Sequence, residues 1–159
     1  MDALQRMAAR AVDVAAIVVF TAMFGCVIAQ VVFRYFLGDP LVWSDELARY
    51  LLVWCAFLGW VIAARRRSHL AVSMLESRLG PRGRGALGFV GALAALLFSA
   101  MLGWQGWRIA ARNLDVDTTT LFFTFGVVYA IVPLACLLVG LHALADARAA
   151  LRRLVGGSA

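Results

Sequence analysis

Four long apolar stretches constrain the fold of this 159-residue chain more than any other feature. Residues 14–33, 85–107 and 121–145 contain no charged side chain over 20, 23 and 25 positions, respectively. Residues 51–64 form a shorter stretch, which Leu47, Ala48 and Tyr50 extend toward the N-terminus. A helix needs about 20 apolar residues to cross a 30 Å hydrocarbon core. The pattern therefore predicts four transmembrane helices.

The predicted fold class is an all-α membrane protein, with residues 1–159 as a single four-helix domain. We expect spans at about 14–35, 43–65, 85–107 and 121–145. The composition agrees, because 64% of the residues are hydrophobic and the mean hydropathy is +0.87, against about 45–50% apolar residues in soluble domains. The net charge of +6 does not indicate nucleic-acid binding, since the arginines lie at the ends of the spans. Anionic lipid headgroups are their expected partners.

The arginines also predict the orientation of the chain. The N-terminal segment, the 65–84 connection and the C-terminal tail together carry 11 arginines, whereas the 33–50 and 108–120 connections carry 4. Positively charged loops stay in the cytoplasm. We therefore expect both termini and the 65–84 connection to be cytoplasmic.

The second span is expected to begin with helical turns in the membrane interface. Asp39 and Pro40 resemble an N-cap followed by proline at the first helical position. Asp45 and Glu46 follow in the early turns, where the helix dipole favours acidic groups. Arg49 lies within ion-pair reach of both carboxylates. A helix from about residue 40 to 66 exceeds the hydrocarbon thickness, so its first turns should lie at headgroup depth.

The spans lack the residues that chemistry or ion coupling would need. No ionisable group lies near the centre of any span, although such groups usually mark ion pathways. The three cysteines are isolated, and no nucleophile and base are arranged for catalysis. We therefore expect no catalytic, cofactor or metal site, and a protein that works with a partner subunit rather than as an enzyme.

Small residues and one proline predict how the helices pack. Glycine and alanine recur at four-residue spacing, which lets helix backbones approach closely in lipid. These pairs are Gly25 with Ala29, Gly88 with Ala92, Gly91 with Ala95, and Gly126 with Ala130. Pro133 removes a backbone donor and clashes with the carbonyl of Tyr129, so we expect a kink in the fourth span.

Several motifs, taken in order, resemble a known family. They are Phe33-Arg34-Tyr35-Phe36, then Pro40-Leu41-Val42-Trp43-Ser44-Asp45-Glu46-Leu47-Ala48-Arg49, then Trp54 and Phe57-Leu58-Gly59, then Arg65-Arg66-Arg67 with His69, and finally Tyr129 with Pro133. Their order and spacing are similar to those of the small permease subunit of tripartite ATP-independent periplasmic (TRAP) transporters. Two positions depart from the family pattern: Ser73 stands where an acidic residue is common, and Phe125 where a tryptophan is common.

The resemblance implies a scaffold role in the bacterial inner membrane. In this family a periplasmic binding protein captures an organic acid, and a large permease subunit moves it by an elevator-type motion coupled to Na⁺. The small subunit packs against the large one and stays still. The expected partners are therefore the large permease, the periplasmic binding protein and membrane lipids.

The motif residues are interpreted as structural or interface positions. Arg34 is expected to form an ion pair with Asp45 or Glu46; the alternative is that it reaches lipid headgroups. Trp43 is expected to anchor the chain in the interface or to contact a partner. His69 is expected to form a hydrogen bond rather than to bind a metal, because no second ligand stands at metal spacing. Gly59 is expected to allow close packing.

Two other functions remain open from the residues alone. One is a four-helix membrane enzyme such as a lipid- or glutathione-using transferase, which the lack of a polar cluster within the spans disfavours. The other is an assembly or accessory subunit of an unrelated membrane complex. The genes next to this one would distinguish these readings from a transporter subunit.

Overall fold

Four membrane-length helices make up nearly all of the structure. The computed structural model describes residues 3–66 and 80–156. Its elements are α1 (Ala3–Val32), the π-helical turn η1 (Phe33–Leu37), α2 (Val42–Arg66), α4 (Pro81–Arg112), α5 (Phe125–Tyr129) and α6 (Ile131–Gly156). Helical segments long and apolar enough to cross a membrane are Arg6–Leu37, Val42–Arg66, Gly83–Arg112 and Phe125–Arg152. The predicted all-α class and its four spans are confirmed.

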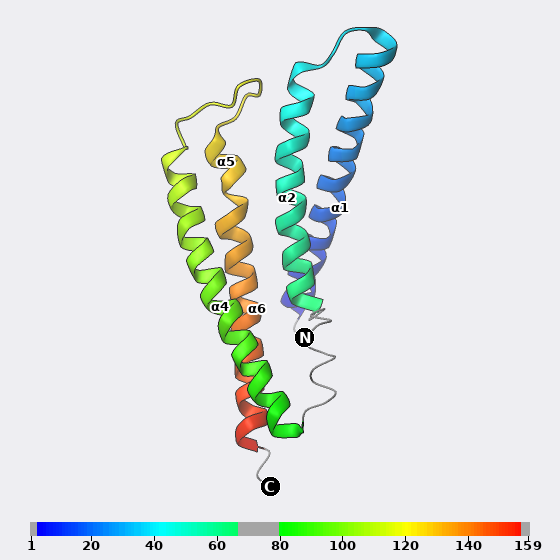
Figure 1. Cartoon of the computed structure of the whole chain (residues 1–159). Helices are drawn as coiled ribbons and strands as arrows, with labels where there is room; N and C mark the ends of the chain where they lie inside the picture. The colour runs from blue at the N-terminus through cyan, green and yellow to red at the C-terminus, as the bar shows by residue number, and fades with distance from the viewer. Residues whose placement is uncertain (1–2, 67–79, 157–159) are drawn as a thin grey trace.

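The helices form two antiparallel hairpins. Figure 1 shows α1 beside α2, and α4 beside α5 and α6. The most extensive helix contact is between α4 and α6, followed by that between α1 and α2, and the contact of α2 with α6 joins the two hairpins. The beginnings of α1 and α4 lie at the same end of the molecule as the ends of α2 and α6 (Figure 1). This end is called the open end below, and the opposite one the loop end.

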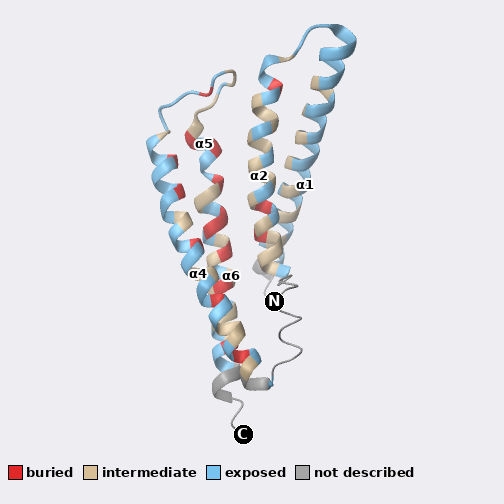
Figure 2. Cartoon of the chain, in the orientation of Figure 1, coloured by how far each residue is buried: buried red, intermediate tan, exposed pale blue. Residues whose placement is uncertain are grey.

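The buried core is small and lies where α2 meets α6. Val61, Ala135 and Val139 are almost fully buried, and Phe57 and Trp60 pack against them. Burial is concentrated on α6 and on the inner face of α4, whereas α1 is exposed along most of its length (Figure 2). No residue in the most apolar window of the first span is buried. The chain therefore presents a broad apolar surface to its surroundings.

The second helix begins later than the sequence suggested. The expected start at Asp39 and Pro40 is wrong, because α2 begins at Val42 and residues 38–41 are not helical. The first span continues through η1 and ends at Gly38, whose φ of 70° reverses the chain at little steric cost. Residues 39–41 then carry the chain across to α2. Within the first turn of α2, the Ser44 hydroxyl donates to the Leu41 carbonyl at 2.7 Å.

The fourth span starts at Phe125 instead of residue 121, and its helix is divided at Ala130, three residues before Pro133, where a kink was expected. Residues 121–124 belong to the loop after α4, and the helix is divided into α5 and α6 at Ala130. Pro133 has no N–H to donate to the carbonyl of Tyr129, four residues earlier. Hydrogen bonding continues on either side, from the Ala130 amide to the Gly126 carbonyl and from the Leu134 amide to the Ala130 carbonyl.

The closest helix approach involves glycines outside the predicted pairs. An added Cβ on Gly106 of α4 would lie 2.5 Å from Val132 Cγ1 of α6, and one on Gly103 would lie 3.0 Å from Cys136 Cβ. Among the glycines of the predicted pairs, Gly126 is tightly enclosed, with Leu114 Cδ2 at 2.8 Å from its added Cβ. Gly88 is in ordinary contact, 3.7 Å from Ala150 Cβ, and Gly25 and Gly91 have no such neighbour within 4 Å in the described chain.

Candidate functional site

A carboxylate at the start of α2 connects the two hairpins at the loop end. Glu46 accepts hydrogen bonds from the backbone amides of Thr119 and Thr120, at 3.2 and 2.8 Å, and from the Thr120 hydroxyl. The Tyr50 hydroxyl, one turn further along α2, donates to the same carboxylate at 2.5 Å. Four donors thus converge on one half-buried side chain. We call Glu46, Tyr50, Thr119 and Thr120 the Glu46 bridge.

The loop between α4 and α5 is folded so that it offers these donors. The Thr118 hydroxyl donates to the carbonyls of Leu121 and Phe123, at 2.9 and 2.7 Å, and Thr118 is buried. The amide of Gly126 donates to the Asn113 carbonyl at 2.8 Å and so closes the base of the loop. These contacts hold the loop on both sides of residues 119 and 120. The backbone amides of these two residues therefore point toward α2 and donate to Glu46.

Aromatic side chains extend the same contact toward the membrane centre. Tyr50 packs edge-on against Phe123 and Phe125, with ring centroids 6.2 and 5.9 Å apart. Trp54, one turn deeper, donates from its indole Nε1 to the Val128 carbonyl at 3.2 Å. The predicted residues Glu46 and Trp54 therefore lie on one face of α2, against the start of the fourth span.

Asp45 points away from the bridge. It accepts a hydrogen bond from the Gln30 amide nitrogen of α1 at 3.3 Å, and it forms an ion pair with Arg49 at 3.8 Å. Both side chains of that pair are at least 70% exposed, so the pair adds little stability. Asp45 therefore connects α2 to α1, while Glu46 connects α2 to the second hairpin.

The structure does not bring Arg34 to either carboxylate. The ion pairs formed by residues of the first hairpin, within the described range 3–66, are Arg49 with Asp45 and Arg65 with Asp13, and neither includes Arg34. Arg34 lies in η1 and is exposed, as are Tyr35 and Trp43, which are 76% and 42% exposed. These three residues form the outer tip of the first hairpin. Their roles toward lipid or a partner stay predictions.

Three further predicted residues have separate outcomes. Gly59 is exposed, and in the described chain an added Cβ would meet nothing within 4 Å, so the close packing expected there does not occur within the chain. Pro133 lies against α4, with its Cδ 3.4 Å from an added Cβ on Gly106. His69 falls outside the described residues.

An ion pair at the open end was not among the contacts predicted from the sequence. Arg65 of α2 donates to Asp13 of α1 at 2.6 Å, and the Arg65 side chain is only 19% exposed. A signal was present, because Asp13 precedes the first apolar stretch and Arg65 follows the second. In an antiparallel hairpin these positions lie at the same level. The first hairpin is therefore held by polar contacts at both ends.

The arrangement is suited to holding helices together. Within the described ranges, no group of three or more His, Cys, Asp or Glu residues could hold a metal ion. The polar side chains with defined partners connect α1 to α2, and α2 to the second hairpin. The Glu46 contacts hold the two hairpins together at the loop end, the small core joins them near the middle, and the other two contacts hold α1 to α2 within the first hairpin.

Comparisons with known proteins identify the family. Residues 23–153 match the family described as tripartite ATP-independent periplasmic transporters, DctQ component. The small permease protein SiaQ of a sialic acid TRAP transporter from Vibrio cholerae is 28% identical over 69% of this chain. The small permease protein TeaB of an ectoine TRAP transporter from Halomonas elongata is 30% identical over 72% of it.

A third relative is much longer than this chain. The permease protein SiaT of a sialic acid TRAP transporter from Haemophilus influenzae is 40% identical over 58 residues, which are 36% of this chain and 9% of that permease. The match to the small permeases covers 63% of SiaQ and 61% of TeaB, so it spans less than two thirds of their lengths. With the family match covering most of its residues, the chain belongs to the DctQ component family of the tripartite ATP-independent periplasmic transporters.

Proposed function

We propose that this chain is the small membrane subunit of a TRAP transporter that imports an organic acid, with uptake coupled to Na⁺ through the large permease. The family supports the transporter class. The relatives SiaQ and SiaT are named for sialic acid, which is an organic acid. In SiaT, a segment similar to this chain is a minor part of a longer permease. That arrangement supports a large permease as the partner of the separate chain.

The observation that carries the proposal is the exposed first span. Phe20, Phe24 and Ile28 are 57%, 57% and 49% exposed, and no residue in the most apolar window of this span is buried. A four-helix bundle that worked alone would be expected to bury part of each helix. An open pair of hairpins instead provides a long apolar face for another membrane subunit.

The proposed orientation has both termini in the cytoplasm and the Glu46 bridge on the periplasmic side. The arginine asymmetry of the sequence supports it. In this orientation the exposed tip with Arg34, Tyr35 and Trp43 faces the periplasm. The tip is then available to the headgroups and to a periplasmic substrate-binding protein, the third proposed component.

Co-purification tests the proposal directly. The chain should be produced together with a large TRAP permease from the same genome, with an affinity tag on the large permease alone. We expect both chains to elute from gel filtration in mild detergent as one complex. A four-span membrane protein of another family serves as the control for adhesion through detergent. Elution of a folded chain apart from the permease would contradict the proposal.

A further inference from the structure

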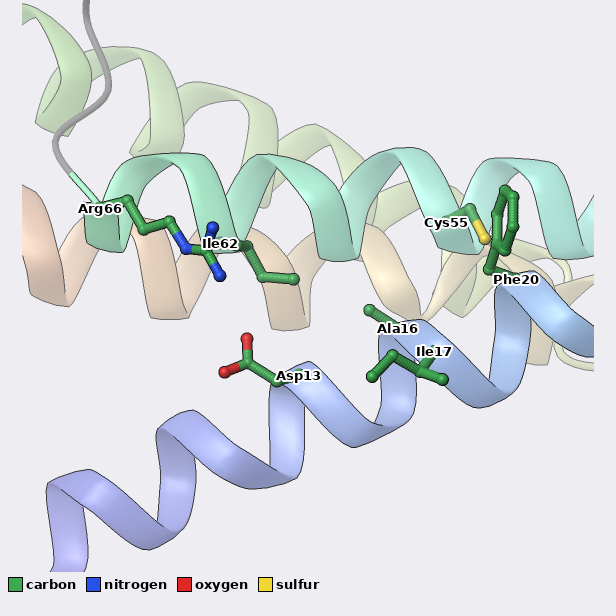
Figure 3. A pocket seen from close by; sticks show the side chains of 7 residues that line it. All are labelled: Asp13, Ala16, Ile17, Phe20, Cys55, Ile62 and Arg66. Carbon is green, nitrogen blue, oxygen red and sulfur yellow. The ribbon is translucent and has the colours of Figure 1, made fainter.

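A groove runs between α1 and α2 from the open end into the apolar part of the first hairpin. Its volume is about 450 Å³. Figure 3 shows Asp13 of α1 and Arg66 of α2 facing each other at its mouth, with Ile62 and Ile17 further in. Ala16, Phe20 and Cys55 line the remainder. The groove is thus polar at the end of the helices and apolar along its walls.

The mouth of the groove carries an excess of positive charge. Asp13 is already paired with Arg65 at 2.6 Å, and Arg65 is mostly buried in that contact. Arg66 is exposed and has no ion pair with any residue of the described ranges. Arg10, one turn before Asp13, is also exposed. An anionic group at this position would therefore meet at least one arginine whose charge no carboxylate balances.

The length of the groove matches one leaflet of a bilayer. Cys55 and Arg66 are 11 residues apart on α2, which corresponds to about 16 Å along a helix. Half of a 30 Å hydrocarbon core is about 15 Å. A ligand with its charge at Arg66 could therefore lay an apolar chain along Ile62 and Phe20 and end near the centre of the membrane.

The volume favours a thin ligand over another helix. A helix about 10 Å in diameter would occupy roughly 1,200 Å³ over that length, whereas the groove offers about 450 Å³. We propose that the groove binds one acyl chain of an anionic phospholipid, whose phosphate is held by Arg66. The lipid fills the space between α1 and α2, and no transport activity is needed for it to bind.

Native mass spectrometry of the purified full-length chain in detergent tests this proposal. The probes are dioleoylphosphatidylglycerol and dioleoylphosphatidylcholine, which have the same acyl chains and differ in headgroup charge. We expect one phosphatidylglycerol to bind about five-fold more tightly than phosphatidylcholine, the factor that one arginine contributes toward anionic lipid. Glycerol phosphate, which lacks acyl chains, should not displace the bound lipid at equal concentration.

Two matched pairs of variants locate the site. Arg66→Gln should abolish the preference for phosphatidylglycerol, whereas Arg152→Gln, an exposed arginine on α6 near the same end, should keep it. Ala16→Phe should fill the groove and weaken both lipids at least five-fold. Ala15→Phe, on the exposed face of α1 outside the groove, should bind both as the natural chain does. Circular dichroism of each variant identifies any that fail to fold.

Three results would overturn the proposal. They are equal binding of the two lipids by the natural chain, an unchanged headgroup preference in Arg66→Gln, and displacement of the lipid by glycerol phosphate. If Ala16→Phe does not fold, Ile62→Trp takes its place as the groove-filling change, with the same expected loss. Because binding is measured on the isolated chain, failure here is distinct from failure of the transporter assignment.

Discussion

The close contact between α4 and α6 predicts how much stability the chain loses when Gly106 is replaced by alanine. Alanine at this position would place its Cβ 2.5 Å from Val132 Cγ1 and 2.9 Å from Val132 Cβ. Ordinary contact begins at 3.4 Å, so Cγ1 would have to retreat by about 0.9 Å, the difference between 3.4 and 2.5 Å. Rotation of the valine side chain cannot move its Cβ, which is attached to the helix backbone. The two helices would therefore have to separate locally.

The cost can be estimated by comparison with a second glycine of the same helix. Overpacking of this kind costs about 1–3 kcal/mol, while replacing glycine by alanine in a helix contributes about 0.5–1 kcal/mol in the opposite direction. Gly91 is also in α4, and an added Cβ there would meet nothing within 4 Å of the described chain. Gly91→Ala should therefore gain the helix stabilisation of alanine without the cost of overpacking. The two variants should differ by about 1–3 kcal/mol, with Gly106→Ala the less stable.

The assay is unfolding of the purified chain in mixed micelles. Helix content is followed by circular dichroism while sodium dodecyl sulfate is titrated, and the free energy of unfolding is compared between the two variants. If Gly106→Ala unfolds at the same detergent fraction as Gly91→Ala, the close approach of α4 to α6 at Val132 is refuted. Co-elution with the large permease provides a second readout, because both variants leave the exposed face of α1 unchanged.

Two more predictions follow from the Glu46 bridge and from the arginines. Glu46→Gln and Thr120→Val should each lower the recovery of folded chain, and the loss in the double variant should be smaller than the sum of the two single losses, because the two side chains meet directly. The loss caused by Arg34→Ala should instead add in full to that of Glu46→Gln. If the losses from Glu46→Gln and Thr120→Val are additive, the Glu46 bridge is contradicted. Reporter fusions test the orientation. Fusions after residues 38 and 115 should report a periplasmic position, and fusions after residues 75 and 159 a cytoplasmic one. A periplasmic signal at residue 75 would contradict the proposed topology.

Much of the fold could be predicted because membrane spans depend on local composition. An apolar stretch of sufficient length specifies a helix in lipid, where every backbone group must find an internal partner. The same local chemistry predicted a kink at Pro133, since a missing donor affects only the carbonyl four residues earlier, and the helix is divided at Ala130, next to that carbonyl. The predicted limits of the spans were less accurate: α2 begins at Val42 rather than at Pro40. The start of α2 depends on the turn at Gly38, which ends η1 and was not predicted from the sequence.

The partners of the polar residues could not be read from the sequence. Arg34 was expected to pair with Asp45 or Glu46, but Glu46 binds backbone amides more than 70 residues away. Those amides are available because the Thr118 hydroxyl and the Gly126 amide shape the loop after α4. Such a long-range contact has no periodic pattern in the sequence. Trp54 and Glu46, which the motifs singled out, both contact the second hairpin, and their importance for assembly stays a prediction.

Uptake by reconstituted components tests the scaffold role most directly. Proteoliposomes should be prepared with this chain alone, with the large permease alone, and with both together, each with the periplasmic binding protein and its organic acid outside and an inward Na⁺ gradient. Uptake is expected only when both membrane chains are present, because no described span of this chain carries an Asp, Glu, Lys or Arg residue near its centre. Saturable uptake by this chain alone, or full uptake by the large permease without it, would contradict the account.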